Sequence, residues 1–278
     1  MITEEMYADI VAMAMREDLG AAGDITTETT IASDAFATAE LRTRQPGAIA
    51  GLDAARYVFD VFDPELKFET SVSDGDRVEA GRVLAVVEGK ARSILSAERT
   101  ALNLLGRMSG VASQTALLVD AVEGTGARIS DTRKTMPGLR ALDKYAVRMG
   151  GGVNHRFGLY DAVLIKDNHI AAVGSITTAV ESVRARFGHT VTVEVEVETL
   201  SQLEELLETD TDTVLLDNMA PMELAEAVEM VGGRMATEAS GGVTLETVRE
   251  IAEAGVDVIS VGWITHSAPQ LDIGLDFL

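Results

Sequence analysis

The feature that most constrains the fold is a strand, loop and helix rhythm that repeats from residue 127 onward. Six short apolar segments alternate there with stretches of helical periodicity. The expected strands are residues 127–130, 162–165, 191–197, 213–216, 234–239 and 258–261. Between them, Ser175 and Thr244 are expected to cap helices, and Pro221 to open another. Strands that alternate with helices pair in parallel, so we expect a (β/α) barrel or a doubly wound sheet, with about six strands instead of eight.

The N-terminal part lacks this rhythm and predicts a small α+β domain. Residues 24–27 suggest a loop, and residues 36–95 mix short strands with glycine turns. A helix is expected from Ser96 through Leu105, where two glycines follow at 106 and 110. Each glycine costs a helix about 1 kcal/mol relative to alanine, so close packing or a break is expected there. We therefore assign residues 1–107 to the N-terminal domain and 108–278 to the barrel domain, with the last few residues as candidates for a return to the first domain.

Composition excludes several function classes. The 278 residues carry 45 acidic and 23 basic side chains, a formal charge of −22, which opposes approach to nucleic acid or to an anionic membrane. The absence of cysteine excludes disulfides, thiolate nucleophiles and cysteine-ligated zinc. The acidic start of the chain is unlike a signal peptide, and no apolar run is long enough to span a membrane, so a cytoplasmic protein is expected.

Basic residues are few and unevenly placed. Only five are lysines, which fits either a surface adapted to a very salty cytoplasm or an ordinary acidic protein. Residues 128–169 nevertheless contain eight basic and only four acidic side chains. Such an island in an acidic chain predicts an anionic ligand bound in a cleft. The alternative is a solvated helix face.

Polar residues follow the expected strands, where (β/α) barrels carry their active sites. The strand ends supply Asp131-Thr132-Arg133-Lys134, Lys166-Asp167-Asn168-His169, the row Glu194, Glu196 and Glu198, Asp217-Asn218, Glu238-Ala239-Ser240-Gly241-Gly242, and Gly262. The three glutamates share one strand face, which predicts either cationic partners or a solvent-facing edge. The Ser240-Gly241-Gly242 turn before an expected helix indicates a phosphate site, together with the turn at Val261-Gly262.

Two arginines and a histidine add a preference for a dianionic ligand. Arginine forks bind carboxylates in a bidentate manner, so Arg133 and Arg156 suit a planar di-acid better than a sugar. His155 beside Arg156 is either a neutral hydrogen-bond donor or a satisfied loop histidine.

Motifs along nearly the whole chain resemble those of the quinolinate phosphoribosyltransferase family. They are Glu17-Asp18-Leu19-Gly20, Gly23-Asp24-Ile25-Thr26-Thr27, Ala50-Gly51-Leu52, Ser96-Ala97-Glu98-Arg99-Thr100-Ala101-Leu102-Asn103, Asp131-Thr132-Arg133-Lys134-Thr135, Lys144-Tyr145-Ala146-Val147, Asn154-His155-Arg156, Leu164-Ile165-Lys166-Asp167-Asn168-His169, Glu194-Val195-Glu196, Leu215-Leu216-Asp217-Asn218, Ser240-Gly241-Gly242 and Thr265-His266-Ser267. Several motifs in the family's order make this resemblance specific.

The resemblance implies a fold, a reaction and an assembly. The fold is a small N-terminal α+β domain packed on an open, incomplete (β/α) barrel, type II phosphoribosyltransferase-like. The reaction joins quinolinate to phosphoribosyl pyrophosphate with Mg²⁺ and no organic cofactor, and releases nicotinate mononucleotide, pyrophosphate and CO₂. Family members are homodimers or hexamers built from dimers, in which the residue matching Arg99 enters the neighbouring site.

The resemblance also implies roles for individual residues. Lys134, Lys166, Glu196 and Asp217 are the expected catalytic residues, and Glu196 and Asp217 the candidate Mg²⁺ ligands. The full expected substrate-binding set is Arg99, Thr132, Arg133, Lys134, His155, Arg156, Lys166, Glu196, Asp217, Ser240, Gly241, Gly242, Val261, Gly262 and His266. Within that set, the carboxylates of quinolinate are expected at Arg99, Arg133, His155 and Arg156, and the 5′-phosphate at residues 240–242, Gly262 and His266.

Three other functions compete with this interpretation. A paralogue with the same fold, associated with molybdenum transport, would act on a different acid. A biotinyl or lipoyl carrier module is suggested by turns in residues 74–89, but it needs a lysine at a hairpin tip, and Lys90 lies beyond the expected strand. A phosphate-sugar isomerase barrel would not need two arginines for ring carboxylates.

Overall fold

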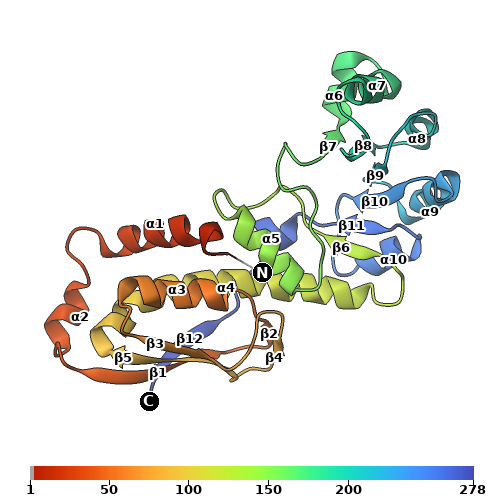
Figure 1. Cartoon of the computed structure of the whole chain (residues 1–278). Coiled ribbons are helices and arrows are strands. Elements are labelled where there is room, and N and C mark those ends of the chain that lie inside the picture. Colours follow the sequence, from red (N-terminus) through yellow and green to blue (C-terminus); the bar gives the residue numbers. More distant parts are fainter. Residues whose placement is uncertain (1–2) are drawn as a thin grey trace. The chain divides into compact units, whose positions relative to one another are not determined.

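The computed structural model describes residues 3–278 and divides the chain into two compact units. The first comprises Met1–Ala116, Thr135–Gly151 and Trp263–Leu278, and the second comprises Leu117–Lys134 and Gly152–Gly262. Each unit has its own β-sheet (Figure 1). The first unit therefore draws on two segments that follow the start of the second unit in the sequence.

The first unit is built on an antiparallel sheet with the strand order β12-β1-β5-β3. These strands are β1 (Phe36–Thr43), β3 (Lys67–Thr70), β5 (Val83–Lys90) and β12 (Ile273–Phe277), and a separate ribbon pairs β2 (Gly47–Ala48) with β4 (Arg77–Val78). The helices are η1 (Glu4–Met6), α1 (Ala8–Leu19), α2 (Ile25–Thr30), α3 (Leu52–Phe62), α4 (Ala91–Ala121), α5 (Arg140–Met149) and α11 (Trp263–His266), and the last residues of α4 belong to the second unit. The C-terminal strand thus completes a sheet that begins near the N-terminus.

Alternating burial along β1 shows why this segment forms a strand. Ala39, Leu41 and Thr43 are buried, whereas the residues between them are partly exposed. This period of two puts one face of the strand against the core. Phe59 from α3 is fully buried and stacks on Phe68 of β3 with ring centroids 5.5 Å apart, so the helix and the sheet share one hydrophobic core.

Helix α4 runs unbroken through both glycines, which serve close packing. A Cβ atom at Gly110 would lie 2.1 Å from the Pro269 carbonyl oxygen, and one at Gly106 would lie 3.0 Å from the Leu271 carbonyl oxygen. The Leu271 amide also donates to the Gly106 carbonyl at 2.9 Å. The glycines therefore admit the segment that leads into β12. Although α4 has 31 residues, no helix within residues 3–278 is long and apolar enough to cross a membrane.

The second unit contains one parallel sheet of six strands, as the sequence predicts. Its order is β6-β11-β10-β9-β8-β7, and every pairing is parallel. The strands are β6 (Arg128–Ser130), β7 (Val163–Ile165), β8 (Val193–Val197), β9 (Thr213–Asp217), β10 (Ala236–Ser240) and β11 (Val258–Ser260). Within residues 3–278, β6 and β7 are the two edges and do not pair with each other, so the barrel is open. The expected incomplete (β/α) barrel is confirmed.

Four of the helices of the second unit pack against the strands that precede or follow them. The helices are α6 (Asp167–Val173), α7 (Ile176–Arg186), α8 (Leu200–Leu206), α9 (Pro221–Val231) and α10 (Val248–Glu253), with α7 and α8 contacting β8, α9 contacting β10, α10 contacting β11, and α6 packing on α7. Figure 1 shows α7 to α10 following one another along the sheet. The expected cap at Ser175 and the expected Pro221 at the helix start are confirmed.

Two local expectations are wrong. Residues 24–27 do not form a loop, because the Asp24 side chain accepts the Thr27 amide at 2.9 Å and caps α2. Thr244 does not cap a helix, because α10 begins only at Val248, and the Thr244 amide instead donates to the Thr247 hydroxyl in the turn before it. The Gly241-Gly242 turn is therefore not joined directly to a helix N-terminus.

Candidate active site

Strand register places acidic and polar side chains in rows across one face of the parallel sheet. Glu196 on β8 pairs with Leu215 on β9, and Leu215 pairs with Glu238 on β10. One row closer to the C-terminal ends of the strands, Asp217 pairs with Ser240. Residues that pair directly, or lie two apart on one strand, point to the same side of a sheet. These five side chains therefore share the face and the end of the sheet where barrels carry active sites.

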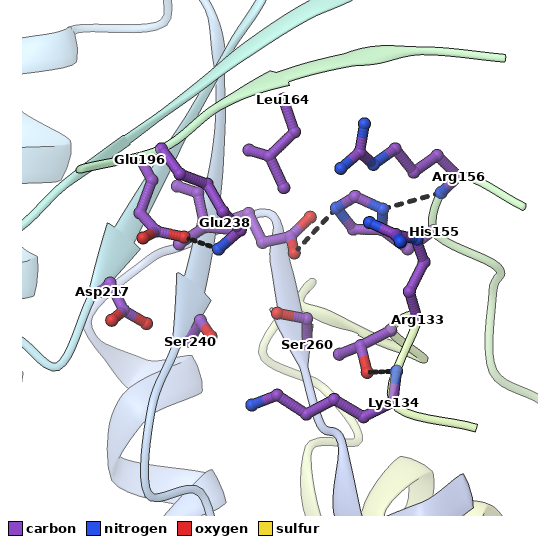
Figure 2. A pocket seen from close by; sticks show the side chains of 13 residues that line it. Arg133, Lys134, His155, Arg156, Leu164, Glu196, Asp217, Glu238, Ser240 and Ser260 are labelled. Carbon is purple, nitrogen blue, oxygen red and sulfur yellow. Dashed lines mark hydrogen bonds and ion pairs between the residues drawn. The ribbon is translucent and has the colours of Figure 1, made fainter. Parts of the chain in front are cut away.

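A pocket of about 340 Å³ opens on this face (Figure 2). That volume is within the range of small-molecule sites. The pocket is lined by Thr132, Arg133, Lys134, His155, Arg156, Leu164, Lys166, Glu196, Leu215, Asp217, Glu238, Ser240 and Ser260. All of these residues belong to the second unit, and they come from β7 to β11, from the residues just after β6 and β7, and, for His155 and Arg156, from the segment between α5 and β7.

One wall of the pocket carries an ion pair between Lys166 and Glu196. Lys166 follows β7 directly, and its Nζ contacts Oε2 of Glu196. Glu196 is only 9% exposed, so the lysine compensates a carboxylate that would otherwise be buried without a partner. Glu194 is also buried, whereas Glu198 lies beyond the strand end and is exposed. The glutamate row is therefore part of a built site and not a solvent-facing edge.

His155 lies at the centre of a buried acidic cluster, and both of its ring nitrogens have protein partners. Nδ1 accepts the backbone N–H of Arg156 at 2.7 Å. Nε2 lies 3.0 Å from Oε2 of Glu194 and 3.6 Å from Oε1 of Glu238. The backbone N–H of His155 donates to Asp131, which is fully buried, at 3.0 Å. His155 is thus a satisfied loop histidine whose Nε2 faces carboxylates.

The environment of the cluster shifts two pKa values. Burial and the neighbouring Glu194 raise the pKa of Glu238 to about 7. Burial, together with the nearby positive charge of Arg133, lowers the pKa of Arg156 below its ordinary value. Arg156 Nη1 donates to the Ala162 carbonyl at 3.0 Å, while its buried Nε has no hydrogen-bond partner within the described chain. The Glu238 carboxyl can therefore gain or lose a proton near neutral pH, and the Arg156 Nε–H can donate to a ligand.

The side chains of this cluster have the spacing of a metal site, but the histidine nitrogen that would bind the metal carries a hydrogen. One candidate ligand atom each from His155, Glu194 and Glu238 lies within 4.8 Å of the other two. Because Nδ1 of His155 accepts an N–H, the hydrogen of the neutral ring is on Nε2. Nε2 therefore has no lone pair to offer a metal. Asp217, which is partly exposed, and Glu196 are the carboxylates of the pocket with the oxygen chemistry that Mg²⁺ prefers.

Asp217 is positioned by the next residue. Asn218 has a left-handed backbone with φ 57°, and its Nδ2 donates to Oδ2 of Asp217 at 2.6 Å. The backbone N–H of Asn218 also donates to the Ser240 carbonyl at 2.9 Å. Left-handed geometry costs a residue with a side chain about 1–2 kcal/mol, and such strain is common at functional sites. The loops after β9 and β10 are thereby joined at the edge of the pocket.

Most of the predicted site residues meet in this pocket. Nine of them line it: Thr132, Arg133, Lys134, His155, Arg156, Lys166, Glu196, Asp217 and Ser240. Gly241, Gly242, Val261 and Gly262 belong to the same unit but not to the lining, and the Val261 amide donates to the Ser130 carbonyl. Arg99 on α4 and His266 on α11 belong to the first unit, and both are exposed.

The basic island divides between the pocket and a helix. Arg133, Lys134, Arg156 and Lys166 line the pocket. Arg140, Lys144 and Arg148 instead lie at four-residue spacing on α5, and Arg128 begins β6. Lys144 is only 1% exposed, so these residues do not form a solvated helix face. An anionic ligand site remains the interpretation of the other four.

No site role was expected from the sequence for five side chains that line or support the pocket, although Glu194 and Glu238 stand among the polar residues at the expected strand ends. They are Glu194, Glu238, Leu164, Leu215 and Ser260. Glu238 precedes Ser240 by two residues on the expected strand 234–239, so strand alternation already places both on one face. The signal for Glu238 was available, because a carboxylate on the site-bearing face of a buried strand needs a partner.

Comparisons with known proteins connect this pocket to one family. The family model described as "Quinolinate phosphoribosyl transferase, C-terminal domain" matches residues 111–276, and the corresponding N-terminal domain model matches residues 24–109. The chain belongs to the quinolinate phosphoribosyltransferase family. Every residue that lines the pocket falls within the C-terminal match.

Relatives in this family match over nearly the whole chain. A "Nicotinate-nucleotide pyrophosphorylase [carboxylating]" of Mycobacterium leprae is 48% identical over 273 residues, which cover 96% of each chain. A "Quinolinate phosphoribosyltransferase [decarboxylating] 1b" of Nicotiana tabacum is 44% identical, over 96% of this chain and 81% of the relative. The crystal structure of NadC from Streptococcus pyogenes is 40% identical, with a TM-score of 0.95 over 100% of this chain and 99% of that one. The two-part architecture is therefore that of the quinolinate phosphoribosyltransferase family.

Proposed function

We propose that the pocket at the C-terminal ends of β6 to β11 is where this quinolinate phosphoribosyltransferase acts. The enzyme transfers phosphoribosyl from phosphoribosyl pyrophosphate to quinolinate with decarboxylation, and so forms nicotinate mononucleotide, pyrophosphate and CO₂ in NAD biosynthesis. The observation that carries the assignment is one cavity, in a chain of this family, that combines four cations with the carboxylates Glu196 and Asp217. Cations suit two anionic substrates, and carboxylates suit a cationic transition state.

The arginines bind the quinolinate carboxylates in this proposal. Arg133 and Arg156 line the pocket, and burial together with their proximity lowers the pKa of Arg156. Two guanidinium groups close enough to repel each other favour a ligand that carries two negative charges. The unpartnered Nε of Arg156 supports the same assignment, since a carboxylate oxygen would satisfy it.

Glu196 and Asp217 act on the ribose. Loss of pyrophosphate leaves positive charge on C1 and the ring oxygen of the ribose, and preorganised carboxylates stabilise that charge. Asn218 holds Asp217 and Lys166 holds Glu196, so neither carboxylate has to reorganise during the reaction. The pyridine nitrogen of quinolinate then bonds to C1. As CO₂ leaves, its bonding electron pair stays on C2 of the ring, where the adjacent positive nitrogen stabilises it, and C2 then takes up a proton from water, so no organic cofactor is needed.

Lys134 and Lys166 serve the pyrophosphate. Both line the pocket and carry flexible ammonium groups that bind phosphates as point charges. Mg²⁺, held mainly by the substrate phosphates and by Glu196 and Asp217, would neutralise the leaving pyrophosphate. This proposal is consistent with the exposure of Asp217 at the pocket edge.

The 5′-phosphate is assigned to the glycine turns. Ser240 lines the pocket, and Gly241 and Gly242 follow it with φ values of 98° and 60°. Glycines in such turns let backbone amides approach a phosphate closely. Gly262 and His266 complete this assignment as the family resemblance implies, and Val261 belongs to the same turn as Gly262.

The enzyme is proposed to work in the cytoplasm as a homodimer, or as a hexamer of dimers, in which Arg99 enters the neighbouring site. Arg99 is consistent with that role, because its side chain is 64% exposed and only loosely paired with Glu98, at 3.9 Å. An exposed arginine on a rigid helix is available to a second subunit.

One assay tests the proposed reaction. Purified protein with phosphoribosyl pyrophosphate and Mg²⁺ is given carboxyl-labelled quinolinate or, as a control, nicotinate, and pyrophosphate and labelled CO₂ are measured at low and molar salt. We expect both products with quinolinate and neither with nicotinate. Turnover of another pyridine acid instead would favour the paralogue associated with molybdenum transport, which the matched relatives do not favour.

A further inference from the structure

The buried acids around His155 have no role in the reaction described so far. Glu194 and Glu238 are each 6% exposed and face the imidazole, and the fully buried Asp131 accepts the backbone N–H of His155. Oε1 of Glu194 and Oε1 of Glu238 have no hydrogen-bond partner among the described residues, although Glu238 Oε1 lies 3.6 Å from the imidazole. Burying acidic groups in this way is costly, so a stabilising or functional reason is required.

The hydrogen bonds of the ring determine its tautomer. Nδ1 accepts the Arg156 amide at 2.7 Å and therefore carries a lone pair. Nε2 faces the Glu194 carboxylate at 3.0 Å and therefore carries the hydrogen. A carboxylate that accepts one ring N–H fixes both the tautomer and the orientation of a histidine. Figure 2 shows the ring between the Glu238 carboxylate on one side and the Arg156 amide on the other.

We propose that Glu194 and Glu238 are positioning residues that hold His155 as the Nε2–H tautomer, and that His155 in turn positions Arg156 by accepting its amide. In this arrangement His155 acts through Arg156 and does not itself bind a substrate carboxylate. The inference deepens the proposed function and rests on the assignment of Arg156 to quinolinate.

The surrounding contacts support a chain of positioning from the sheet to the arginine. Glu194 and Glu238 lie on β8 and β10, so their backbones are fixed by the parallel pairing. Asp131, directly after β6, fixes the His155 backbone and also accepts from Nδ2 of Asn154. Near neutrality Glu238 is partly protonated, because burial and Glu194 raise its pKa to about 7, so the pair of acids avoids the full cost of two adjacent charges. Rigid strands therefore position a side chain that is carried by a loop.

The first test measures the tautomer directly. Long-range ¹H–¹⁵N spectra of protein labelled in its four histidines, with His155→Asn to assign the signals, report which ring nitrogen is protonated. We expect neutral Nε2–H imidazole at pH 7, unchanged when quinolinate is added. An imidazolium, an Nδ1–H tautomer, or a tautomer change on quinolinate binding would overturn the proposal. This readout does not depend on turnover, so an inactive wild-type enzyme would reject the proposed function without deciding the tautomer.

The second test uses a matched pair of variants at Glu194. Glu194→Ala removes the acceptor for Nε2–H, and Glu194→Gln keeps an acceptor oxygen without the charge. We expect Glu194→Ala to raise KM for quinolinate about tenfold, with kcat and KM for phosphoribosyl pyrophosphate within about threefold of wild type. Glu194→Gln is expected to restore KM to within about threefold of wild type.

Two results would contradict the positioning role in these variants. If Glu194→Gln is as impaired as Glu194→Ala, the charge matters and not the acceptor. If kcat falls while KM for quinolinate is unchanged, the cluster acts in the chemical step. If Glu194→Ala fails to fold, the histidine spectra of Glu194→Gln still test the proposal. Loss of the Nε2–H signal of His155 in Glu194→Gln would contradict it.

Discussion

Gly241 lies so close to Asn218 that no larger residue fits at position 241. A Cβ atom there would lie 2.1 Å from Oδ1 of Asn218 and 2.9 Å from its backbone nitrogen. Gly241 also has a φ of 98°, which side-chain-bearing residues rarely adopt. Since Asn218 holds Asp217, the contact links the proposed phosphate turn to the proposed ribose carboxylate.

Gly241→Ala should therefore impair both stability and catalysis. The new methyl group displaces Asn218 and releases Asp217, so we expect the free energy of unfolding to fall by more than about 2 kcal/mol and kcat/KM to fall at least about tenfold. Gly174→Ala is the matched control, because Gly174 has a φ of 102° but no atom within 4 Å of the added Cβ. The free energy of unfolding of this control should fall by only about 1 kcal/mol, because of backbone strain, and its activity should be unchanged. If Gly241→Ala and Gly174→Ala lowered the unfolding temperature and kcat/KM by the same amounts, the contact between position 241 and Asn218 would not explain the effect.

Glu238→Gln should stabilise the protein at alkaline pH. The pKa of Glu238 rises from an ordinary 4.5 to about 7 on folding, so its cost to stability is absent below pH 4.5 and is complete above pH 7. The difference between these pKa values corresponds to about 3 kcal/mol. The groups that act on Glu238 are Glu194, His155, Asp131 and the Ser260 hydroxyl.

Thermal unfolding at pH 5 and pH 8 measures this effect. We expect Glu238→Gln to unfold at a higher temperature than wild type at pH 8 and at a similar temperature at pH 5. Glu198→Gln is the control, because Glu198 is exposed beyond the end of β8, and it should match wild type at both pH values. A gain for Glu238→Gln that is the same at both pH values would show that the carboxyl does not titrate in this window.

Arg156→Lys should weaken quinolinate binding selectively. Lysine keeps the positive charge but cannot form the bidentate fork, nor replace both the Ala162 contact and the contact to a carboxylate. Initial-rate kinetics should show KM for quinolinate raised at least about thirtyfold, with KM for phosphoribosyl pyrophosphate within about threefold of wild type. Arg128→Lys, at the start of β6 and outside the pocket lining, should behave like wild type. An increase of both KM values in Arg156→Lys would assign the arginine to phosphate binding.

Salt should activate this enzyme. A chain with a net charge of −22 repels itself and its anionic substrates, and molar salt screens exposed charges over about 3 Å. We expect specific activity and the unfolding temperature to rise together from 0.1 to 2 M KCl. Both should be measured on the same preparation, with sucrose of equal osmolality as a control for water activity. Highest activity at low ionic strength would identify an ordinary acidic protein.

The sequence by itself determined the parallel sheet and the residues at its strand ends. Short apolar strands that alternate with helices can bury their residues only in a parallel sheet with helices packed against it, so the order of elements already specifies the end that carries the site. Lys134, Lys166, Glu196 and Asp217 follow from that rule, because each lies at or just beyond the C-terminal end of a strand. The hydrophobic periodicity of a strand or helix is a local property of the sequence, so it can be recognised without knowing the tertiary contacts.

Tertiary structure decided which of these side chains meet. Whether Gly106 and Gly110 break or pack a helix depended on residues 269–271, more than 150 positions away. The pairing of Glu196, Leu215 and Glu238 depended on strand register, and the tautomer of His155 on a carboxylate from another strand. Contacts between distant segments depend on how the whole core packs, and the protonation of a buried group depends on the neighbours that this packing supplies.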